Sequence, residues 1–246
     1  MTKKRSKDSR VLKAERKVES EVFDRATLQI LSKLIKKGIL QSVDFPISTG
    51  KEANVFRATT PEGGYLAVKI YKIETSFFFR RSEYLEGDPR FKKIKNNEFD
   101  IAIAFARKEF KNLQICEQAN VHSPKPIFVD KNVMVMTFIG EGELPYPTMN
   151  ILGPTSEAEL DSIISDMKKM YSAGLVHTDL SEYNILLAKD APYLIDFGQA
   201  VVIRHPRAKE FLERDVRNIL HYFAKFGYKK DFDQVVKFII EQQKEQ

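Results

Sequence analysis

The chain has 246 residues, of which 43% are hydrophobic and 30% are charged. This length fits one bilobal domain or two small domains, and the apolar content excludes a disordered chain. The apolar runs are too short to cross a bilayer and the first residues are charged, so we expect neither a membrane span nor a secretory signal. The single cysteine, Cys116, excludes a disulfide framework and a Cys-rich metal site, which indicates a reducing, cytoplasmic compartment.

The N-terminal arm, residues 1–17, holds eight bases and two acids. Its net charge of +6 equals that of the whole chain, so the charges of the remaining residues balance. Such an arm fits the phosphates of RNA or of a ribonucleoprotein, and it fits equally well a solvated, frayed terminus. Residues 18–40 have the apolar spacing of an amphipathic helix that stops at Gly38.

Extended segments dominate the chain up to about residue 140. They are predicted at 43–47, 55–58, 65–71, 126–130 and 133–139. The second and third of these form a hairpin around a Pro-Glu-Gly-Gly turn. After this hairpin, residues 76–93 show no periodicity and are predicted to form a long loop. A long helix is predicted at 96–119, before the last two extended segments.

Helices dominate the second half. Pro145 and Pro147 break the chain into a connector. The later helices and short strands are predicted at 156–173, 185–187, 193–195, 207–226 and 231–243. Ser156 is the candidate N-cap of the first of these helices, and Glu159 would complete a capping box.

The change from strands to helices near residue 140 predicts an α+β fold with two lobes that meet at a cleft. We expect residues 1–44 to form the basic arm and an N-terminal helix. Residues 45–139 would form an N-lobe of β-sheet and one helix. Residues 140–246 would form a C-lobe that carries the catalytic and metal-binding loops.

The strongest chemical signal is His-Thr-Asp-Leu-Ser-Glu-Tyr-Asn at 177–184, followed by Asp-Phe-Gly at 196–198. This order and spacing match the catalytic and metal-binding segments of protein kinases. Asp179 would lie at the attacking oxygen, while Asn184 and Asp196 would hold Mg²⁺, which needs only one or two protein groups beside phosphates and water. Each residue alone has an ordinary structural explanation, but chance explains the set poorly.

Lys69 ends the apolar sequence Leu-Ala-Val-Lys in a predicted strand. A buried ammonium needs an anionic partner, which the phosphates of ATP and a helix glutamate would provide. Glu109 is our choice of glutamate, with Glu98 as the alternative. Without the downstream motifs, a strand lysine that extends to solvent would explain Lys69 more simply.

The segment Ile47–Val55 occupies the place of a glycine-rich loop but contains only Gly50, and it does not fit the Walker pattern. The hydroxyl of Ser48, the backbone N–H groups near Gly50 and the ammonium of Lys51 fit a role in covering phosphates. By itself, the segment fits a plain hairpin turn better.

Four segments together resemble the RIO family of atypical serine/threonine protein kinases, and most of all its type-one branch. They are Ser-Thr-Gly-Lys-Glu-Ala-Asn-Val from Ser48, Gly-Asp-Pro-Arg-Phe from Gly87, the His177 segment, and Ile-Asp-Phe-Gly-Gln from Ile195. The match runs from about Ser48 to the C-terminal helices. The residues before Ser48 are too few for the winged-helix domain of the type-two branch, and the absence of long tails indicates an archaeal source.

The resemblance implies a bilobal protein-kinase-like fold with a reduced C-lobe. Asp179 would be the catalytic aspartate, and Asn184 and Asp196 would bind the metal. Lys69 would contact phosphate, with Glu109 as its ion-pair partner.

Further binding roles follow from the same resemblance. The loop that begins at Ser48 and contains Lys51 would cover the triphosphate. The segment Met136–Ile139 would be the hinge, in which the Thr137 carbonyl and the Ile139 N–H face adenine.

The C-lobe lacks the segment on which ordinary kinases dock peptides. Helix-like sequence begins by about Arg207, and Ala-Pro-Glu does not occur. Ser181 stands where typical serine/threonine kinases have lysine, so a peptide platform is not expected.

The resemblance therefore implies an ATP- and Mg²⁺-dependent kinase and ATPase, with Mn²⁺ as a substitute metal. It would transfer phosphate to itself, on a serine or on Asp196, or to a serine substrate. Its setting would be maturation of the small ribosomal subunit, with a pre-ribosomal particle or rRNA as partner. In relatives the loop at 76–93 carries an autophosphorylated serine, for which Ser76 and Ser82 are the candidates.

Two other functions stay open. Small-molecule phosphotransferases of the aminoglycoside or choline kinase type share H-x-D-x-x-x-x-N, but they have a large C-terminal substrate lobe, and only 48 residues follow Gly198 here. A non-catalytic module that binds pre-ribosomal RNA would use the arm and the 76–93 loop. The presence of Lys69, Asp179 and Asp196 argues against pure scaffolding.

Overall fold

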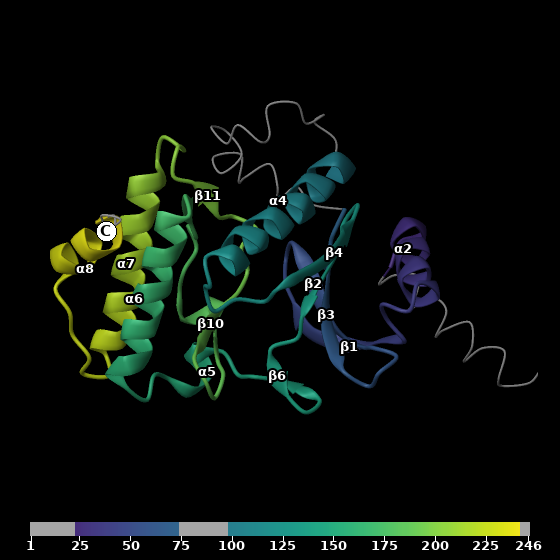
Figure 1. Ribbon diagram of the computed structural model, residues 1–246, viewed down its shortest axis with the longest axis horizontal. Coiled ribbons are helices and arrows are strands. Elements are labelled where there is room, and N and C mark those ends of the chain that lie inside the picture. Colours follow the sequence, from purple (N-terminus) through teal and green to yellow (C-terminus); the bar gives the residue numbers. More distant parts are fainter. Residues whose placement is uncertain (1–22, 74–97, 242–246) are drawn as a thin grey trace, which may run out of the picture.

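The computed structural model describes residues 23–73 and 98–241; the basic arm and the loop predicted at 76–93 lie outside these ranges. Figure 1 shows two lobes, one built on a β-sheet and the other mainly helical, with a long helix extending from the first toward the second. The predicted bilobal α+β architecture is confirmed. In the part of the chain that the structure describes, no helix is long and apolar enough to span a membrane.

The N-lobe is built on one antiparallel sheet with the strand order β1-β2-β3-β5-β4. Its strands are β1 (Ser42–Thr49), β2 (Ala53–Thr59), β3 (Tyr65–Tyr71), β4 (Pro126–Asp130) and β5 (Val133–Thr137). The predicted hairpin is therefore formed by β2 and β3, and β3 occupies the centre of the sheet.

Helix α2 (Arg25–Lys36) covers one face of this sheet (Figure 1). Its first turn is capped by the side chain of Asp24, which accepts hydrogen bonds from the backbone N–H groups of Ala26 and Thr27 at 2.8 and 2.9 Å. The predicted stop at Gly38 is confirmed, since this residue has a φ of 69°, which glycine adopts without steric cost.

Alternation along β3 decides which side chains reach the cleft. Val68 and Ile70 pack in the core beneath α2, so the side chains of Lys69 and Tyr71 point to the opposite face. That face is covered by α4 (Glu98–Gln118), whose Phe105 packs in the same cluster as Tyr71. The strand register thus directs Lys69 toward α4 and the second lobe.

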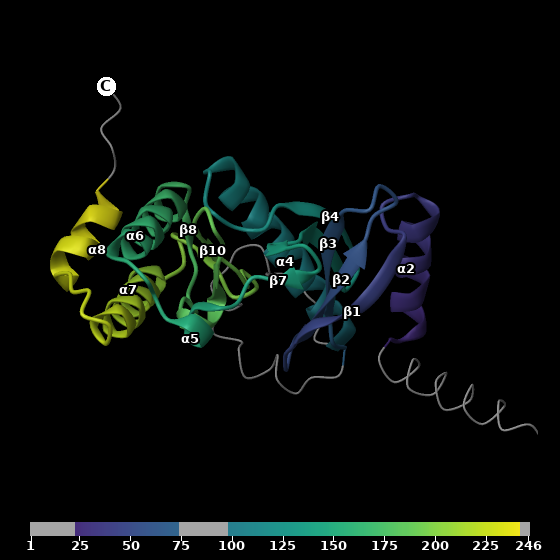
Figure 2. The same ribbon diagram turned by 90° about the horizontal axis from the view of Figure 1, so that it is seen from below.

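The C-lobe packs around a larger apolar core. Its elements are β6 (Gly140–Glu141), β7 (Leu144–Pro145), α5 (Met149–Leu152), α6 (Glu157–Ser172), β8 (Leu175–Val176), the 3₁₀ helix η3 (Glu182–Asn184), β9 (Ile185–Leu187), β10 (Pro192–Leu194), β11 (Val201–Val202), α7 (Ala208–Ala224) and α8 (Phe232–Ile240). Figure 2 shows α6, α7 and α8 together on the side away from the sheet. Leu113 and Cys116 of α4 belong to this core, so α4 is packed into both lobes.

Two local predictions need correction. Ser156 does precede α6, but it makes no capping hydrogen bond with its side chain. The carboxylate of Glu159 instead accepts from the backbone N–H and the hydroxyl of Thr155, at 2.9 and 2.7 Å. A capping box requires it to accept from the N–H of Ser156, one residue later in the chain. The segment predicted as a strand over 133–139 ends as β5 at Thr137, and the connector that follows contains the short β6–β7 hairpin.

Candidate active site

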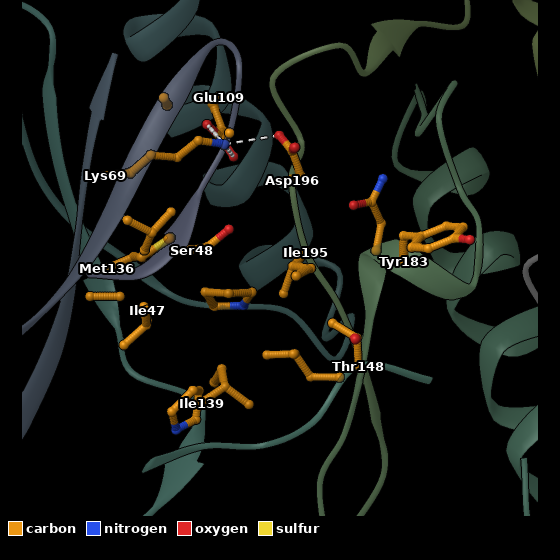
Figure 3. A pocket seen from close by; sticks show the side chains of 18 of the residues that line it. Ile47, Ser48, Lys69, Glu109, Met136, Ile139, Thr148, Tyr183, Ile195 and Asp196 are labelled. Atoms are coloured by element: carbon orange, nitrogen blue, oxygen red, sulfur yellow. Dashed lines mark hydrogen bonds and ion pairs between the residues drawn. The ribbon is translucent and has the colours of Figure 1, made fainter. Parts of the chain in front are cut away.

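A cavity of about 830 Å³ opens between the two lobes. All the candidate site residues of the sequence analysis line it, from both lobes: Ser48, Lys51, Lys69, Glu109, Thr137, Ile139, Asp179, Asn184 and Asp196. Figure 3 shows its two parts, a polar end around Lys69 and Asp196 and an apolar part around Ile47, Met136 and Ile139. One cavity thus offers both charged and apolar side chains to a ligand.

Lys69 is the centre of a buried charge network. Its Nζ lies 2.8 Å from a carboxylate oxygen of Glu109 and 2.9 Å from Oδ1 of Asp196 (Figure 3). The side chains of Lys69 and Glu109 are 8% and 2% exposed, whereas that of Asp196 is 45% exposed and faces the cavity. One ammonium thus joins a glutamate of α4 to the aspartate of the Asp-Phe-Gly segment.

The protonation states of this network follow from burial and charge. Burial alone lowers the pKa of Lys69, but the carboxylates of Asp196 and Glu109 outweigh it, so the pKa lies above its usual value and the ammonium stays charged. Burial raises the pKa of Glu109, and Lys69 opposes that shift. Tyr71 also donates its hydroxyl to Glu109, and burial and this carboxylate hold the pKa of Tyr71 well above its usual value.

Glu109 has a second partner in the C-lobe. Its Oε1 accepts a hydrogen bond of 3.1 Å from the backbone N–H of Phe197. This contact fixes Phe197, the residue next to Asp196. Asp196 itself has a φ of 65°, in the left-handed region that few residues other than glycine, asparagine and aspartate adopt. Of the two glutamates considered, it is Glu109 that forms an ion pair with Lys69 in the structure.

Asp179 also lines the cavity, in the loop that precedes η3. Its backbone carbonyl accepts a hydrogen bond of 2.8 Å from Nδ2 of Asn184, which ties the two residues together. Its Oδ2 accepts one of 3.1 Å from Nε2 of Gln199. The loop therefore presents a carboxylate and an amide to the same cavity that Lys69 and Asp196 line.

The backbone of this loop is held by Asp215 of α7. The buried carboxylate accepts from the N–H groups of Thr178 and Leu180, at 2.7 and 3.1 Å, and Arg214 donates to the carbonyl of Thr178. Burial raises the pKa of Asp215 to about 7, against the effect of the two N–H bonds and of Arg214. Thr178 has a φ of 73°, so these contacts stabilise an unfavourable backbone conformation at the residue before Asp179.

His177 is a structural member of the same loop. Its Nε2 lies 3.0 Å from the carbonyl oxygen of Ile195, and its ring packs on Phe197 with centroids 4.8 Å apart. Burial lowers the pKa of His177 to about 4, so the ring is neutral near pH 7 and Nε2 is the protonated nitrogen that donates to the carbonyl. His177 does not line the cavity, which fits support of the loop and not direct chemistry.

The turn between β1 and β2 lines the cavity with Ser48 and Lys51. It is closed by a hydrogen bond of 2.9 Å from the N–H of Gly50 to the carbonyl of Ala53, as in an ordinary hairpin. Thr137, the last residue of β5, and Ile139, two residues later, also line the cavity. The Ile139 carbonyl accepts a hydrogen bond from the N–H of Tyr146 at 3.2 Å.

The donor set fits a magnesium ion that is shared with phosphates. Among the described residues, no group of three or more histidine, cysteine, aspartate or glutamate side chains is arranged to hold a metal ion. The cavity does offer one carboxylate, Asp196, and one amide, Asn184. This sparse set of oxygen ligands suits Mg²⁺, which keeps several waters and takes its remaining ligands from substrate phosphates.

Sequence reasoning missed four polar residues around the site. Lys108 and Asn112 are buried on α4, and Gln199 and Asp215 are buried in the C-lobe. Asn112 interrupts the apolar side of α4 with a polar residue. Such an interruption was the signal in the sequence that could have indicated a buried polar contact. Their partners lie 20 to 91 residues away in the chain, and no local pattern specifies such a pairing.

Comparison with known proteins gives the family. A model described as the RIO domain matches residues 54–235. The RIO-type serine/threonine-protein kinase Rio1 of Haloferax volcanii is 42% identical over 91% of this chain and 77% of its own length. Rio1 of Thermoplasma acidophilum is also 42% identical, over 75% and 98%. Human RIO1 is 39% identical over 87% of this chain and 39% of its own length.

Solved structures support the fold. The Rio2 kinase–ADP/Mg²⁺–phosphoaspartate complex from Chaetomium thermophilum superposes with a TM-score of 0.63 at 21% identity, covering 86% of this chain and 66% of that one. A second structure of this Rio2 kinase gives a TM-score of 0.64. At such identity the likeness concerns the fold alone. From the family match and the relatives, the chain belongs to the RIO family of serine/threonine-protein kinases, in its RIO1-type branch.

Proposed function

We propose that the chain binds ATP with Mg²⁺ in the cavity between the lobes and transfers the γ-phosphoryl group to itself, on a serine or on Asp196, or to a serine of a substrate. The observation that carries this proposal is the network of Lys69, Glu109 and Asp196, which lines one cavity together with Asp179. If Asp196 held a metal, the buried ammonium of Lys69 would keep Glu109 as a partner, and phosphate oxygens would supply its second anion. The Rio2 complex with ADP and Mg²⁺ supports the same ligands.

Each side chain has a role in this proposal. Lys69 neutralises phosphate oxygens, and Glu109 holds its ammonium in place. Asp179 accepts the proton of the attacking hydroxyl, while Asn184 and Asp196 provide the oxygens for Mg²⁺. The metal, when bound, neutralises charge on the phosphates.

The remaining residues of the cavity would bind the nucleotide. Ser48 and Lys51 line the cavity and would cover the triphosphate. Thr137 and Ile139 border the apolar part and would accept and donate, through their backbone, the hydrogen bonds of adenine.

Transfer to Asp196 has a balanced chemistry. A carboxylate oxygen attacks the γ-phosphorus, the bond to the bridging oxygen of ADP breaks, and an acyl phosphate forms. Water then hydrolyses it to phosphate, which returns the carboxylate and gives net ATP hydrolysis. The exposure of Asp196 to the cavity supports this route.

The test is turnover of γ-labelled ATP by the wild type and by Asp179→Ala. We expect transfer to a serine hydroxyl to fall about 10²- to 10⁴-fold, with ATP still bound, since one proton-accepting group is removed. Asp233→Ala, an exposed acid in the first turn of α8, is the matched control. Full transfer to serine by Asp179→Ala would refute the assignment. Cleavage of the labelled product by hydroxylamine identifies an acyl phosphate, whereas a serine phosphate resists it.

We propose maturation of the small ribosomal subunit as the setting, with RNA as a partner of the basic arm. If the arm binds phosphates, the affinity for rRNA falls steeply with salt, and deletion of residues 1–17 reduces that slope. An unchanged slope after the deletion would dismiss the role of the arm.

A further inference from the structure

Gln199 is the first residue after Asp-Phe-Gly, and its side chain turns back into the cavity. It is 5% exposed, and its Nε2 donates a hydrogen bond of 3.1 Å to Oδ2 of Asp179. An ionised carboxylate offers only acceptors, so the amide must face it with its N–H₂ group. A buried amide aimed at the carboxylate of Asp179 limits the orientations that this side chain can adopt.

The backbone of Gln199 is itself held by α4. Its carbonyl accepts a hydrogen bond of 3.1 Å from Nζ of Lys108, a lysine that is 2% exposed. Asn112, one turn further along α4 and fully buried, donates to the carbonyls of Phe197 and Ala200 at 2.9 and 3.2 Å. Donors from one rigid helix thus fix the segment on both sides of Gln199.

The same helix carries Glu109, which lies between these two residues in sequence and holds Lys69 in the N-lobe. The contacts therefore form a continuous series from Lys69 through α4 to Gln199 and Asp179. In typical kinases a lysine follows the catalytic aspartate by two residues, whereas Ser181 stands there in this chain. The loop that carries Asp179 accordingly lacks a cationic neighbour at that place.

We propose that Gln199 is a positioning residue for phosphoryl transfer: its amide holds the Asp179 carboxylate in the orientation that accepts the proton, and Lys108 and Asn112 hold Gln199 in place. This inference rests on the proposed role of Asp179. Gln199 acts through that side chain and does not itself take part in proton transfer. Loss of its hydrogen bond therefore impairs the chemical step and not the binding of ATP.

The test uses Gln199→Met, which keeps the length of the side chain and removes its N–H₂ group. We expect kcat for ATP turnover to fall about 10- to 100-fold, as for other small misplacements of a reacting group, while the affinity for ATP changes less than about twofold. Gln199→Glu, of nearly equal volume, places a like charge beside Asp179 and lowers kcat further. Gln114→Met, the same change at an exposed position of α4, leaves kcat unchanged.

The second readout is a double-mutant cycle with Asp179→Ala. If Gln199 acts only through Asp179, adding Gln199→Met to Asp179→Ala lowers the residual turnover no further. An equal fold loss in both backgrounds, or a normal kcat in the Gln199→Met and Gln199→Glu variants, would overturn the inference and leave the role of Asp179 intact. Full transfer by Asp179→Ala alone would overturn both.

Discussion

Replacement of Lys69 by methionine tests whether the charge network also stabilises the fold. The change removes the ammonium and leaves the carboxylate of Glu109, 2% exposed, without its cation. Breaking a buried ion pair by removing one partner costs about 3–5 kcal/mol. Glu109 keeps two donors, the hydroxyl of Tyr71 and the N–H of Phe197, so we expect the lower end of that range, about 3 kcal/mol.

Two companion variants separate charge from packing. Glu109→Gln leaves Lys69 paired with Asp196 and is expected to cost less than Lys69→Met. The double variant Lys69→Met/Glu109→Gln contains no unpaired buried charge, because both charged groups are replaced by neutral ones. Its amide oxygen can still accept the hydrogen bond from the N–H of Phe197. Its loss in the free energy of unfolding should be smaller than the sum of the two single losses, by about 1–3 kcal/mol.

The assay is urea unfolding followed by circular dichroism at several pH values. In Lys69→Met the pKa of Glu109, already raised by burial, loses the opposing effect of Lys69. The folded state then binds the proton more tightly than the unfolded state, so stability is highest below the unfolded pKa and falls as pH rises through the folded pKa. Lys69→Met/Glu109→Gln lacks that fall. Strictly additive losses, or the same pH dependence in both variants, would refute the reasoning.

Two further predictions concern the loop around the site. His177→Gln keeps a donor for the Ile195 carbonyl but cannot titrate. The buried ring of His177 has a pKa of about 4 and takes up a proton more readily once the chain unfolds. As pH falls from 6.5 to 4, the free energy of unfolding of the wild type should therefore fall by up to about 3 kcal/mol more than that of this variant. If urea unfolding gave the same change of the free energy of unfolding with pH for the wild type and the variant between pH 6.5 and 4, this prediction would be contradicted. Gly140→Ala places a Cβ 2.3 Å from the carbonyl oxygen of Leu144 and should cost about 1–3 kcal/mol and weaken ATP binding. Gly64→Ala, where the added Cβ makes only an ordinary van der Waals contact, is the control in calorimetry and nucleotide titration. Equal melting temperatures for the two variants would contradict the steric clash expected at Gly140.

Local patterns in the sequence were enough to locate most of the site. Asp179, Asn184 and Asp196 stand in segments whose spacing is characteristic of kinases, and the alternation along one strand places Lys69 on a single face. The helices and strands were largely predictable for the same reason, since their apolar periodicity is a property of neighbouring residues. The capping box at Ser156 was wrong because it depended on which of two adjacent residues the carboxylate would reach.

The amino-acid sequence by itself determined which chemical groups the protein has and on which elements they lie. Only the tertiary structure decided how they are paired, because Lys108 and Asn112 meet the segment around Gln199 through the packing of α4 into both lobes. A buried lysine in a helix looks the same in sequence as an exposed one. Its partner, 91 residues away, is specified by how two lobes close around one helix, and that is a property of the folded chain as a whole.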